Sequence, residues 1–483
     1  MSSDNTKKHA DVAIKAGAWY VISSVIVKAI VFLSTPIFTR ILTSEEYGTI
    51  STFNSWYSLL LPICTLNLTY SIGRAKIDYT DKLDEYVGAM QLLAAFVTGI
   101  FSCLVIFFFR PIVAFVELSP LAVILLLIYL LFSPAISFTQ NSYRYRYKYK
   151  QNIAIAGYTS ICTIVLSVIL LYSLDGDKVT IRILGIVIPT VILSFAFWIK
   201  SFVKHHIKVN REFWKYGIGI SAPLVVHTIS LNILSQSDRI FISRICGLSD
   251  TGIYSVVYTY GLLLSVVTNA IADGWLPWFH DNFHEKRFEN ICKNAKMIVI
   301  LGCYIGLACI GVAPEAIAIL GGTTYIEGVM CVPPIVLGIV CQYIYTHYVN
   351  IELHLKKTKY VAMGTFIAAI LNIILNAIFI PIYGYIAAAY TTFFSYLVLM
   401  VMHYLITKRV FKITIYNNYL MFGAIIITSF IALILTETYN YREVRWGLIL
   451  LGFVSFIYVF RKYILSYILK IFRKYDVRKN RGV

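Results

Sequence analysis

Long apolar segments separated by short polar connections make up most of the chain. A helix needs roughly 20 apolar residues to cross about 30 Å of hydrocarbon, and the sequence supplies about fourteen such segments. We predict spans at residues 13–42, 48–72, 85–109, 119–141, 153–173, 182–203, 215–243, 251–275, 293–320, 328–353, 360–382, 384–407, 416–436 and 446–468. A tight turn from Pro381 to Gly384 joins the eleventh and twelfth. The pattern predicts an all-α, polytopic membrane protein.

The chain also repeats itself. The segment Arg40–Gly48 returns 204 positions later as Arg244–Gly252, with Arg, Ile and the last Gly at the same places. Polar residues at helical spacing share one face of the first span, and the residues 204 positions later are polar as well. The first stripe is Ser24, Lys28, Thr35 and Thr39, and the second is Thr228, Asn232, Arg239 and Ser243. This indicates an internal duplication with a shared polar face.

The two copies lie six spans apart. An even number preserves orientation, so the repeats are parallel and related by an axis along the membrane normal. We therefore predict two six-helix bundles and an appended helix pair. The boundaries are an N-lobe at 1–208, a C-lobe at 209–412, and residues 413–483 for two further helices and a basic cytoplasmic tail.

Composition agrees with a membrane location. The 483 residues are 59% hydrophobic and 14% charged, and the mean hydropathy of +0.74 lies far above that of soluble domains. Most of the 42 Lys and Arg residues fall in connections on one side of the predicted membrane, including both termini. Basic connections stay in the cytoplasm, so we expect both termini to be cytoplasmic.

Few basic residues fall on the opposite side of the predicted membrane. They are Arg40, Arg110, Lys178, Arg182, Arg244, Arg442 and Arg445. The net charge of +18 is therefore a topology signal, and no nucleic-acid partner is expected because no binding module accompanies it.

The sequence contains no motif for catalysis or ATP hydrolysis. HExxH, GxSxG and Walker A patterns are absent, the outward connections are short, and the nine cysteines are scattered as free thiols. Asp175-Gly-Asp177 is best explained as a turn. We therefore expect neither an enzyme nor a cofactor or metal site. Without an ATP motor, any work must come from a gradient, and the sequence leaves open whether H⁺ or Na⁺ would supply it.

The polar stripes hold the candidate binding residues. Lys28 lies near the middle of its span, where a basic side chain costs about 2.5–3.5 kcal/mol, so a lipid-facing position is unfavourable. We expect a cationic cavity between the lobes. Its predicted lining is Lys28, Arg239, Asn232, Thr35, Ser24 and Thr228.

Three further side chains are candidates for ion coupling or structural pairing. Asp238 cannot face Arg239 on the same helix, so we expect its partner on another helix. His227 can titrate near neutral pH. Asp273 precedes Trp275, at a level where it can also meet the water boundary. Glu315 and Glu352 fall near span ends and are given no role.

Several segments resemble one family. They are Glu46-Tyr47-Gly48 after the first span, Asp238–Ile242, Gly252–Tyr254, Leu371–Asn376, Ile380-Pro381, Gly384 and Ala387–Ala389. In this respect the chain resembles the bacterial O-antigen and capsule repeat-unit flippases of the multidrug and oligosaccharidyl-lipid exporter superfamily. Ala387 stands where the family pattern usually has a second Gly, and Tyr390 where a small residue is common.

The resemblance implies a MATE-like pair of lobes that rock between inward-open and outward-open states. It implies an undecaprenyl-diphosphate-linked oligosaccharide as cargo, with membrane lipids, a glycan polymerase and glycosyltransferases as neighbours. An anionic diphosphate agrees with cavity Lys and Arg.

Two other function classes remain open. A cation-coupled multidrug or small-molecule antiporter of the same fold is one, although it would favour buried carboxylates over Lys28 and Arg239. A membrane glycan polymerase or ligase is the other, disfavoured by the short outward connections.

Overall fold

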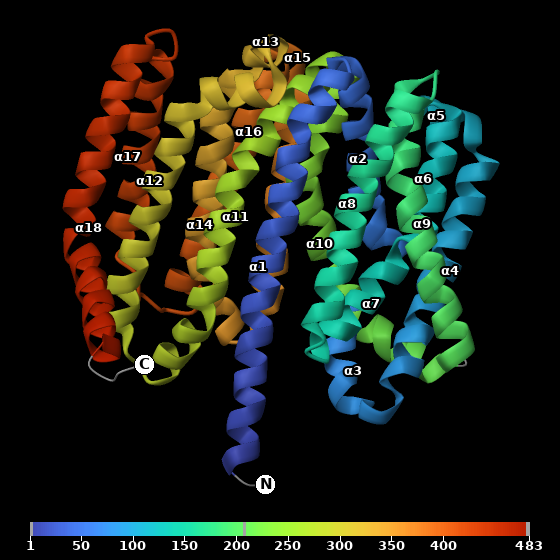
Figure 1. The fold of residues 1–483 in the computed structure, drawn as a ribbon, viewed down its shortest axis with the longest axis horizontal. Coiled ribbons are helices and arrows are strands. Elements are labelled where there is room, and N and C mark those ends of the chain that lie inside the picture. The colour runs from blue at the N-terminus through green and yellow to red at the C-terminus, as the bar shows by residue number, and fades with distance from the viewer. Residues whose placement is uncertain (1–2, 206–208, 480–483) are drawn as a thin grey trace.

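The computed structural model describes residues 3–205 and 209–479, and every regular element within these ranges is a helix. Among the described residues, 12 helical segments are long and apolar enough to cross a membrane. Helices α1 (Ser3–Ile41) and α2 (Ser44–Cys64) run beside them (Figure 1). This agrees with the prediction of about fourteen spans.

The remaining elements follow in chain order. In the first half they are η1 (Leu68–Ser71), α3 (Ile72–Asp78), η2 (Thr80–Lys82), α4 (Leu83–Phe107), α5 (Phe109–Val116), α6 (Pro120–Phe132), α7 (Pro134–Tyr145), α8 (Tyr149–Ser173) and α9 (Lys178–His205). In the second half they are α10 (Arg211–Ile245), α11 (Leu248–His284), α12 (Phe288–Gly321), α13 (Thr323–Ile326), η3 (Glu327–Cys331), α14 (Val332–His354), α15 (Thr358–Tyr383), α16 (Tyr385–Leu405), η4 (Ile406–Val410), α17 (Asn418–Glu437) and α18 (Arg442–Lys479).

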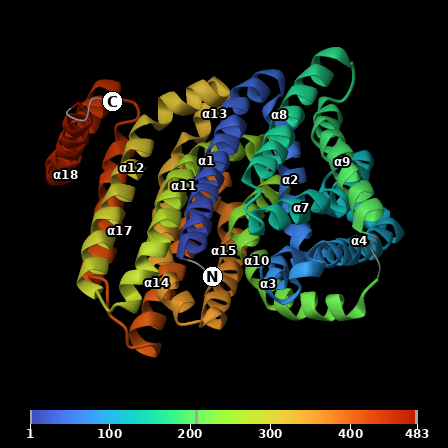
Figure 2. The same cartoon turned by 60° about the horizontal axis from the view of Figure 1, so that its bottom comes forward.

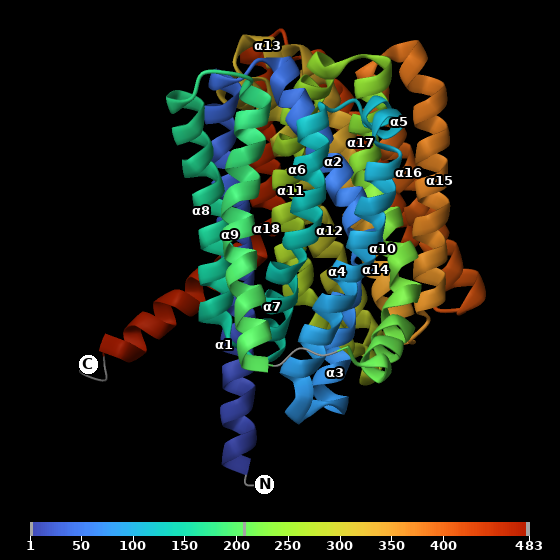
Figure 3. The same cartoon turned by 90° about the vertical axis from the view of Figure 1, so that its right-hand side faces the viewer.

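The helices form two groups with α1 and α10 between them. Helices α2–α9, here the N-terminal bundle, lie on one side, and α11–α16, the C-terminal bundle, lie on the other (Figures 1 and 2). Helices α17 and α18 lie beyond α12 at the outer edge, and the last turns of α18 extend away from the bundle (Figure 3). Both α1 and α10 contact elements of the two bundles.

The internal duplication is visible in this arrangement. Helix α2 begins at Ser44 and α11 at Leu248, which is the 204-residue interval of the sequence repeat. Helix α1 packs on α8, and its counterpart α10 packs on α15, the matching helix of the second half. Helices α2 and α11 pack against each other across the interface between the bundles.

Two predicted spans are broken rather than continuous. The span at 48–72 ends as α2 at Cys64, because Leu66 and Asn67 adopt left-handed φ values of 46° and 54° that an α-helix cannot include. The span at 119–141 breaks between α6 and α7 at Pro134, whose ring nitrogen has no hydrogen to donate to the preceding turn.

Other local features follow the sequence closely. Thr43 caps α2 in a capping box with Glu46, whose carboxylate accepts from the Thr43 N–H at 2.7 Å. The tight turn before α16 is made by Gly384 at φ 69°, a value that favours glycine. Ala387 is buried despite replacing the usual Gly, and Tyr390 points outward with 45% of its surface exposed, so neither residue disturbs the packing.

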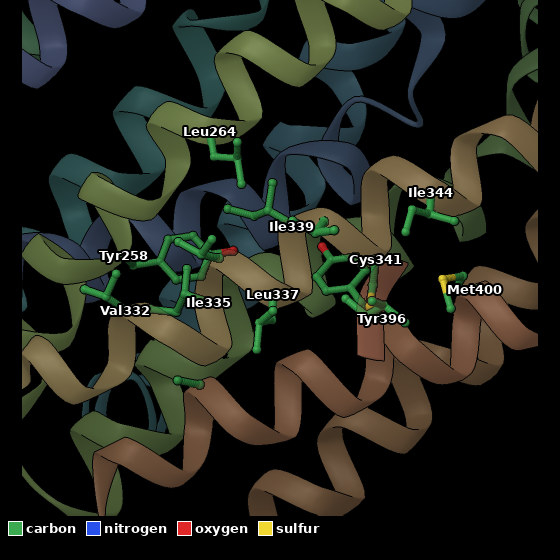
Figure 4. Packing of buried hydrophobic residues seen from close by; sticks show 14 of the residues in the cluster. Tyr258, Leu264, Val332, Ile335, Leu337, Ile339, Cys341, Ile344, Tyr396 and Met400 are labelled. Carbon is green, nitrogen blue, oxygen red and sulfur yellow. The ribbon is translucent and has the colours of Figure 1, made fainter. Parts of the chain in front are cut away.

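The largest apolar core lies in the C-terminal bundle. Side chains from α11, α14 and α16 interlock there, as Figure 4 shows for Tyr258 and Leu264 of α11, Ile339 of α14, and Tyr396 and Met400 of α16. Helix α14 is buried along most of its length. The C-terminal bundle therefore has a continuous packed interior, against which α10 and α2 rest.

Candidate functional site

A cavity of about 240 Å³ lies between the two bundles. Helices α1, α2, α9, α10 and α11 each contribute to it, so both halves of the chain are represented. Its lining is Val31, Ser34, Thr35, Phe38, Leu42, Tyr47, Ile50, Ser51, Asn54, Arg182, Gln236, Arg239 and Thr259. Hydroxyl and amide groups alternate with apolar side chains, and the two charged residues are both arginines.

Arg182 reaches the cavity from the N-terminal bundle. It lies in the second turn of α9, where its guanidinium donates to the Ser167 hydroxyl and lies 3.9 Å from the centre of the Phe38 ring. The sequence prediction counted Arg182 among the basic residues on the outward side and did not include it in the cavity lining, so its place there was missed. A charge near the end of an apolar segment gives no sign of whether it faces water or the bundle interior.

Arg239 enters from the other half of the chain, on α10. It is 7% exposed, donates to the Ser235 carbonyl at 2.8 Å, and lies 4.4 Å from the ring centre of Tyr258. In the described residues neither Arg239 nor Arg182 forms an ion pair with a carboxylate. Both positive charges are thus oriented by neutral acceptors and aromatic faces, which leaves them free to attract an anion.

At one end of this cavity, the two repeat glycines allow the backbones of α2 and α11 to come into close contact. A Cβ on Gly48 would lie 1.8 Å from the Leu248 carbonyl oxygen, and one on Gly252 would lie 2.0 Å from the Ser44 carbonyl oxygen. Ser44 and Leu248 are themselves repeat partners, so the contact is reciprocal. Only glycine allows backbones to approach this closely. The Ser44 and Ser249 hydroxyls add a hydrogen bond of 2.7 Å.

The two repeat arginines cross over at the same end. Arg40 donates to the Ile319 carbonyl of the second half at 3.5 Å, and Arg244 donates to the Phe115 carbonyl of the first half. Ile319 follows Phe115 by the same 204 positions, so these bonds also obey the repeat symmetry. We call these two bonds, together with the glycine and serine contacts, the latch. These contacts explain why the Arg and the last Gly recur in the duplicated segment.

A family model described as polysaccharide biosynthesis protein matches residues 13–283, more than half of the chain. The chain belongs to this family. The match covers α1 through almost all of α11 and therefore includes every residue that lines the cavity.

Two curated proteins are similar in sequence. "Lsg locus putative protein 1" of Haemophilus influenzae is 25% identical over 277 residues, which cover 56% of this chain and 66% of that protein. "Man(5)GlcNAc(2)-PP-dolichol translocation protein RFT1" of Yarrowia lipolytica is 26% identical over 114 residues, 23% of this chain and 17% of that protein. The chain thus spans less than two thirds of either relative.

Solved structures share the fold at low sequence identity. Lipid II flippase MurJ in an inward closed conformation superposes with a TM-score of 0.70 at 15% identity, covering 92% of this chain and 99% of that one. An inward-facing multidrug resistance MATE family transporter of the MOP superfamily gives 0.62 at 13% identity, covering 85% and 96%. The chain therefore has the MATE-like fold that the family resemblance implied.

The predicted cavity residues of this family member divide into three groups. Thr35 and Arg239 line the cavity. Lys28 is exposed one turn before Val31, on the face of α1 that reaches the cavity. Asn232 donates to the Ser58 carbonyl at 2.5 Å, and Thr228 accepts from Asn67 at 2.6 Å, so both join α10 to the N-terminal bundle. The side chain of Ser24 lies outside the described residues.

Asp238 lies at the centre of a buried polar network behind Arg239. Its carboxylate accepts hydrogen bonds from Tyr254 at 2.6 Å, Asn376 at 2.8 Å and Thr392 at 2.8 Å, donors carried by α11, α15 and α16. Asn372 extends the network through Ser237 and Thr392. The partners of Asp238 do lie on other helices, but they are hydrogen-bond donors and not a basic residue.

The oxygen atoms of this network suit a proton or a hard cation better than a transition metal. Among the described residues, no three His, Cys, Asp or Glu side chains gather as a metal site. The nine cysteines are free thiols.

The other titratable candidates lie apart from the cavity. His227 is half-buried and bonds the Thr365 hydroxyl at 2.9 Å, whereas Asp273 is exposed. The two glutamates that the sequence placed near span ends are paired inside the protein. Glu315 accepts from the buried Arg445, and Glu352 pairs with His403 at 2.8 Å with neither side chain exposed. Their pairing partners are distant in sequence, so no local pattern indicated them.

The beginning of α10 is fixed to the N-terminal bundle at the end away from the latch. Trp214 donates to the Ala89 carbonyl at 3.0 Å, and Tyr216 donates to Asp78 at 2.5 Å. Hydrogen bonds from Tyr216 and Arg74 lower the pKa of Asp78. Helix α10 therefore connects the two bundles mechanically while its middle carries Arg239 into the cavity.

Proposed function

We propose that this protein moves an oligosaccharide repeat unit linked to undecaprenyl diphosphate across the bacterial cytoplasmic membrane. The proposal depends above all on the cavity between the bundles, in which Arg182 and Arg239 supply positive charge from opposite halves. Family membership in polysaccharide biosynthesis supports it, as does the fold shared with a lipid II flippase. A partial relative is named for translocation of a diphosphate-linked glycan.

The chemistry of the lining suits a diphosphate sugar lipid. Guanidinium groups bind phosphate oxygens through planar, two-pronged hydrogen bonds, and they balance the charge when the diphosphate leaves water. Ser34, Ser51, Asn54 and Gln236 add neutral donors and acceptors for sugar hydroxyls. We expect Lys28, exposed on the same face of α1, to attract the anion before it enters.

The size of the cavity implies that the bundles move. Pockets for drug-sized ligands occupy about 300–1,000 Å³, so a space of about 240 Å³ is too small for several sugars. We propose an N-lobe at 1–208 and a C-lobe at 209–412 that rock about their interface. The latch holds them together in the state described here, and its release would open the cavity toward the outer leaflet.

We further propose that both termini are cytoplasmic and that the latch faces the outside. The first turn of α1 and the end of α18 lie at the end of the molecule opposite α13 (Figure 1). That is the end to which the basic connections are assigned. A glycan polymerase and glycosyltransferases of the same pathway would be its neighbours in the membrane. The Asp238 network is our candidate for binding a coupling H⁺ or Na⁺.

A deletion strain gives the direct test of the cargo. Cells lacking this protein should accumulate lipid-linked repeat units in the inner leaflet and lose surface polysaccharide. Restoration of the wild-type gene should reverse both changes. If the deletion strain had unchanged amounts of lipid-linked repeat units and of surface polysaccharide, the proposal would be rejected. Altered resistance to cationic drugs with normal polysaccharide would instead favour the antiporter.

A further inference from the structure

We infer that Glu352 and His403 form a proton-binding site in the C-terminal bundle, distinct from the cavity and from the Asp238 network. The pair joins α14 to α16, with His403 Nδ1 and Glu352 Oε1 separated by 2.8 Å. Both side chains are fully buried, at 0% exposure. This inference rests on the proposed transport function for its purpose, but the site itself is defined by geometry alone.

The pair leaves part of its hydrogen-bonding capacity unused. Within the described part of the chain, neither Glu352 Oε2 nor His403 Nε2 finds a partner. A buried polar atom without a partner is destabilising, so a purely structural pair would be expected to satisfy both atoms. The free carboxylate oxygen is an acceptor with room for one more proton.

The walls of this site hold the imidazole in place. His403 stacks on Tyr345 of α14, with ring centres 5.5 Å apart and planes 18° from parallel. On the α15 side, a Cβ at Gly364 would lie 2.9 Å from His403 Nε2, so glycine makes room for the ring edge. The ring can neither turn away nor reach water without movement of α15 or α16.

The titratable neighbours link the site to the helix that lines the cavity. His227 of α10 lies within electrostatic range of His403 and bonds Thr365, the residue after Gly364. From α11, His280 bonds His354, two residues after Glu352. The charged groups near the ends of α14, α15 and α16 are basic, namely Lys356, Lys357, Lys359, Lys408 and Arg409, whereas the end of α11 carries Asp281 and Glu285. Helix α10 continues from His227 to Arg239, so a shift at the pair can reach the cavity.

The proposed step is the binding of one proton by the pair. A carboxylate beside an imidazolium has no net charge, and one proton from water on the predicted cytoplasmic side would bind Glu352 Oε2. The pair would then carry one positive charge among basic neighbours in a sealed site, which burial disfavours strongly. Protonation therefore favours a conformation in which α14 and α16 expose the pair, and loss of the proton favours the closed packing.

Infrared difference spectroscopy on the purified full-length protein in lipid nanodiscs tests this without any cargo. Between about pH 4 and pH 9, a range that brackets ordinary carboxyl and imidazole titration, the wild type should show a protonated-carboxyl band that grows as pH falls. Glu352→Gln should remove the component of this band that a carboxyl shielded from water contributes. The matched variant Glu289→Gln, at an exposed carboxylate on α12, should retain it. Identical spectra for Glu352→Gln and the wild type would overturn the inference.

His403→Gln provides a second variant in case Glu352→Gln does not fold. It keeps the Glu352 carboxyl but removes the ring that contacts Oε1 at 2.8 Å, so the band should persist at a different frequency. An unchanged band frequency in His403→Gln would show that the two side chains do not act as a pair. Because the assay needs no substrate, its failure would reject the proton site while leaving the flippase proposal to the deletion strain.

Discussion

Arg182 and Arg239 approach the cavity from different halves of the chain, and each is oriented by neutral groups. Replacing either with Ala should lower surface polysaccharide at unchanged protein abundance. A charge-assisted hydrogen bond is worth about 1.5–3 kcal/mol, so a loss of about ten-fold to a hundred-fold in cargo affinity is expected. Lys28→Ala should give a smaller decrease, because that side chain is exposed.

Quantification of surface polysaccharide and of the protein in membranes checks this prediction. Arg110→Ala removes an exposed arginine outside the cavity and serves as the control. The prediction would be contradicted if Arg182→Ala and Arg239→Ala, at native expression, both gave wild-type amounts of surface polysaccharide. The arginines would then have no role in transport.

The sequence identified some of these side chains and missed others for clear reasons. Arg239 and Thr35 were predictable because polar residues at helical spacing in an apolar span need a polar neighbourhood. Arg182 lies close to a connection, where topology counting treats every basic residue as solvent-exposed. Glu352 and His403 lie 51 residues apart, and only the packing of α14 on α16 brings them together.

The glycine contact of the latch predicts a conformational effect of small substitutions. Gly48→Ala and Gly252→Ala would each place a methyl group within 2.0 Å of a carbonyl oxygen, so α2 and α11 must separate. Overpacking of this kind costs about 1–3 kcal/mol, which corresponds to a shift of about five-fold or more toward the unlatched state.

Thiol labelling of Ser51→Cys, in the cavity lining, measures that shift from outside the cell. Labelling should accelerate in both glycine variants. Gly99→Ala is the matched control, since a methyl group there meets no atom within 4 Å. Unaltered labelling in Gly48→Ala and Gly252→Ala would show that the latch does not hold the cavity closed.

A partly buried ion pair is one of the contacts that attach α18 to α12. Arg445 is 2% exposed and donates to Glu315 of α12, whose carboxylate also accepts from Trp446. Glu315→Ala would leave the guanidinium buried without a counter-charge. We expect destabilisation near the low end of about 3–5 kcal/mol, because Glu315 itself is 25% exposed.

Thermal unfolding of the purified protein checks this expectation. Arg442→Ala removes an arginine that is 77% exposed and lies 3.8 Å from the same carboxylate. That control should change stability by less than about 1 kcal/mol. Equal melting temperatures for Glu315→Ala and Arg442→Ala would contradict a structural role for the buried pair.

Periodicity predicted where the helices run better than where they break. The long apolar spans and the Gly384 turn follow from hydrophobic length and from the backbone freedom of glycine. The breaks after Cys64 and at Pro134 lie inside equally apolar sequence. A window of hydropathy detects neither the proline ring at 134, nor the left-handed backbone at Leu66 and Asn67, nor the tertiary bond from Tyr57 to Ser133 at 2.8 Å.

The orientation of the whole molecule follows from the distribution of basic residues. Reporters fused after Lys150 and after Lys359 should report the cytoplasm, and one at Asp175 should report the exterior. Alkaline phosphatase and a fluorescent protein, used as a pair, distinguish the two sides. An opposite signal at any of the three positions would refute the predicted topology.

Among the features of the sequence, the internal duplication predicted the most about the arrangement of the whole molecule. A repeat of even span number implies parallel halves, and the arrangement of α2 with α11 and of the crossed arginines agrees with that symmetry. The repeated glycines suggested a shared feature, but sequence alone could not show that the two copies touch. The close approach of the two backbones is a property of the assembled fold.

A reversible disulfide across the latch tests the rocking of the two halves most directly. The Ser44 and Ser249 hydroxyls are 2.7 Å apart, so the double variant Ser44→Cys with Ser249→Cys should cross-link on oxidation. We predict that oxidised cells stop exporting polysaccharide and accumulate lipid-linked repeat units in the inner leaflet, that reduction restores export, and that neither single variant responds. Export at the wild-type rate from fully cross-linked protein would contradict the account.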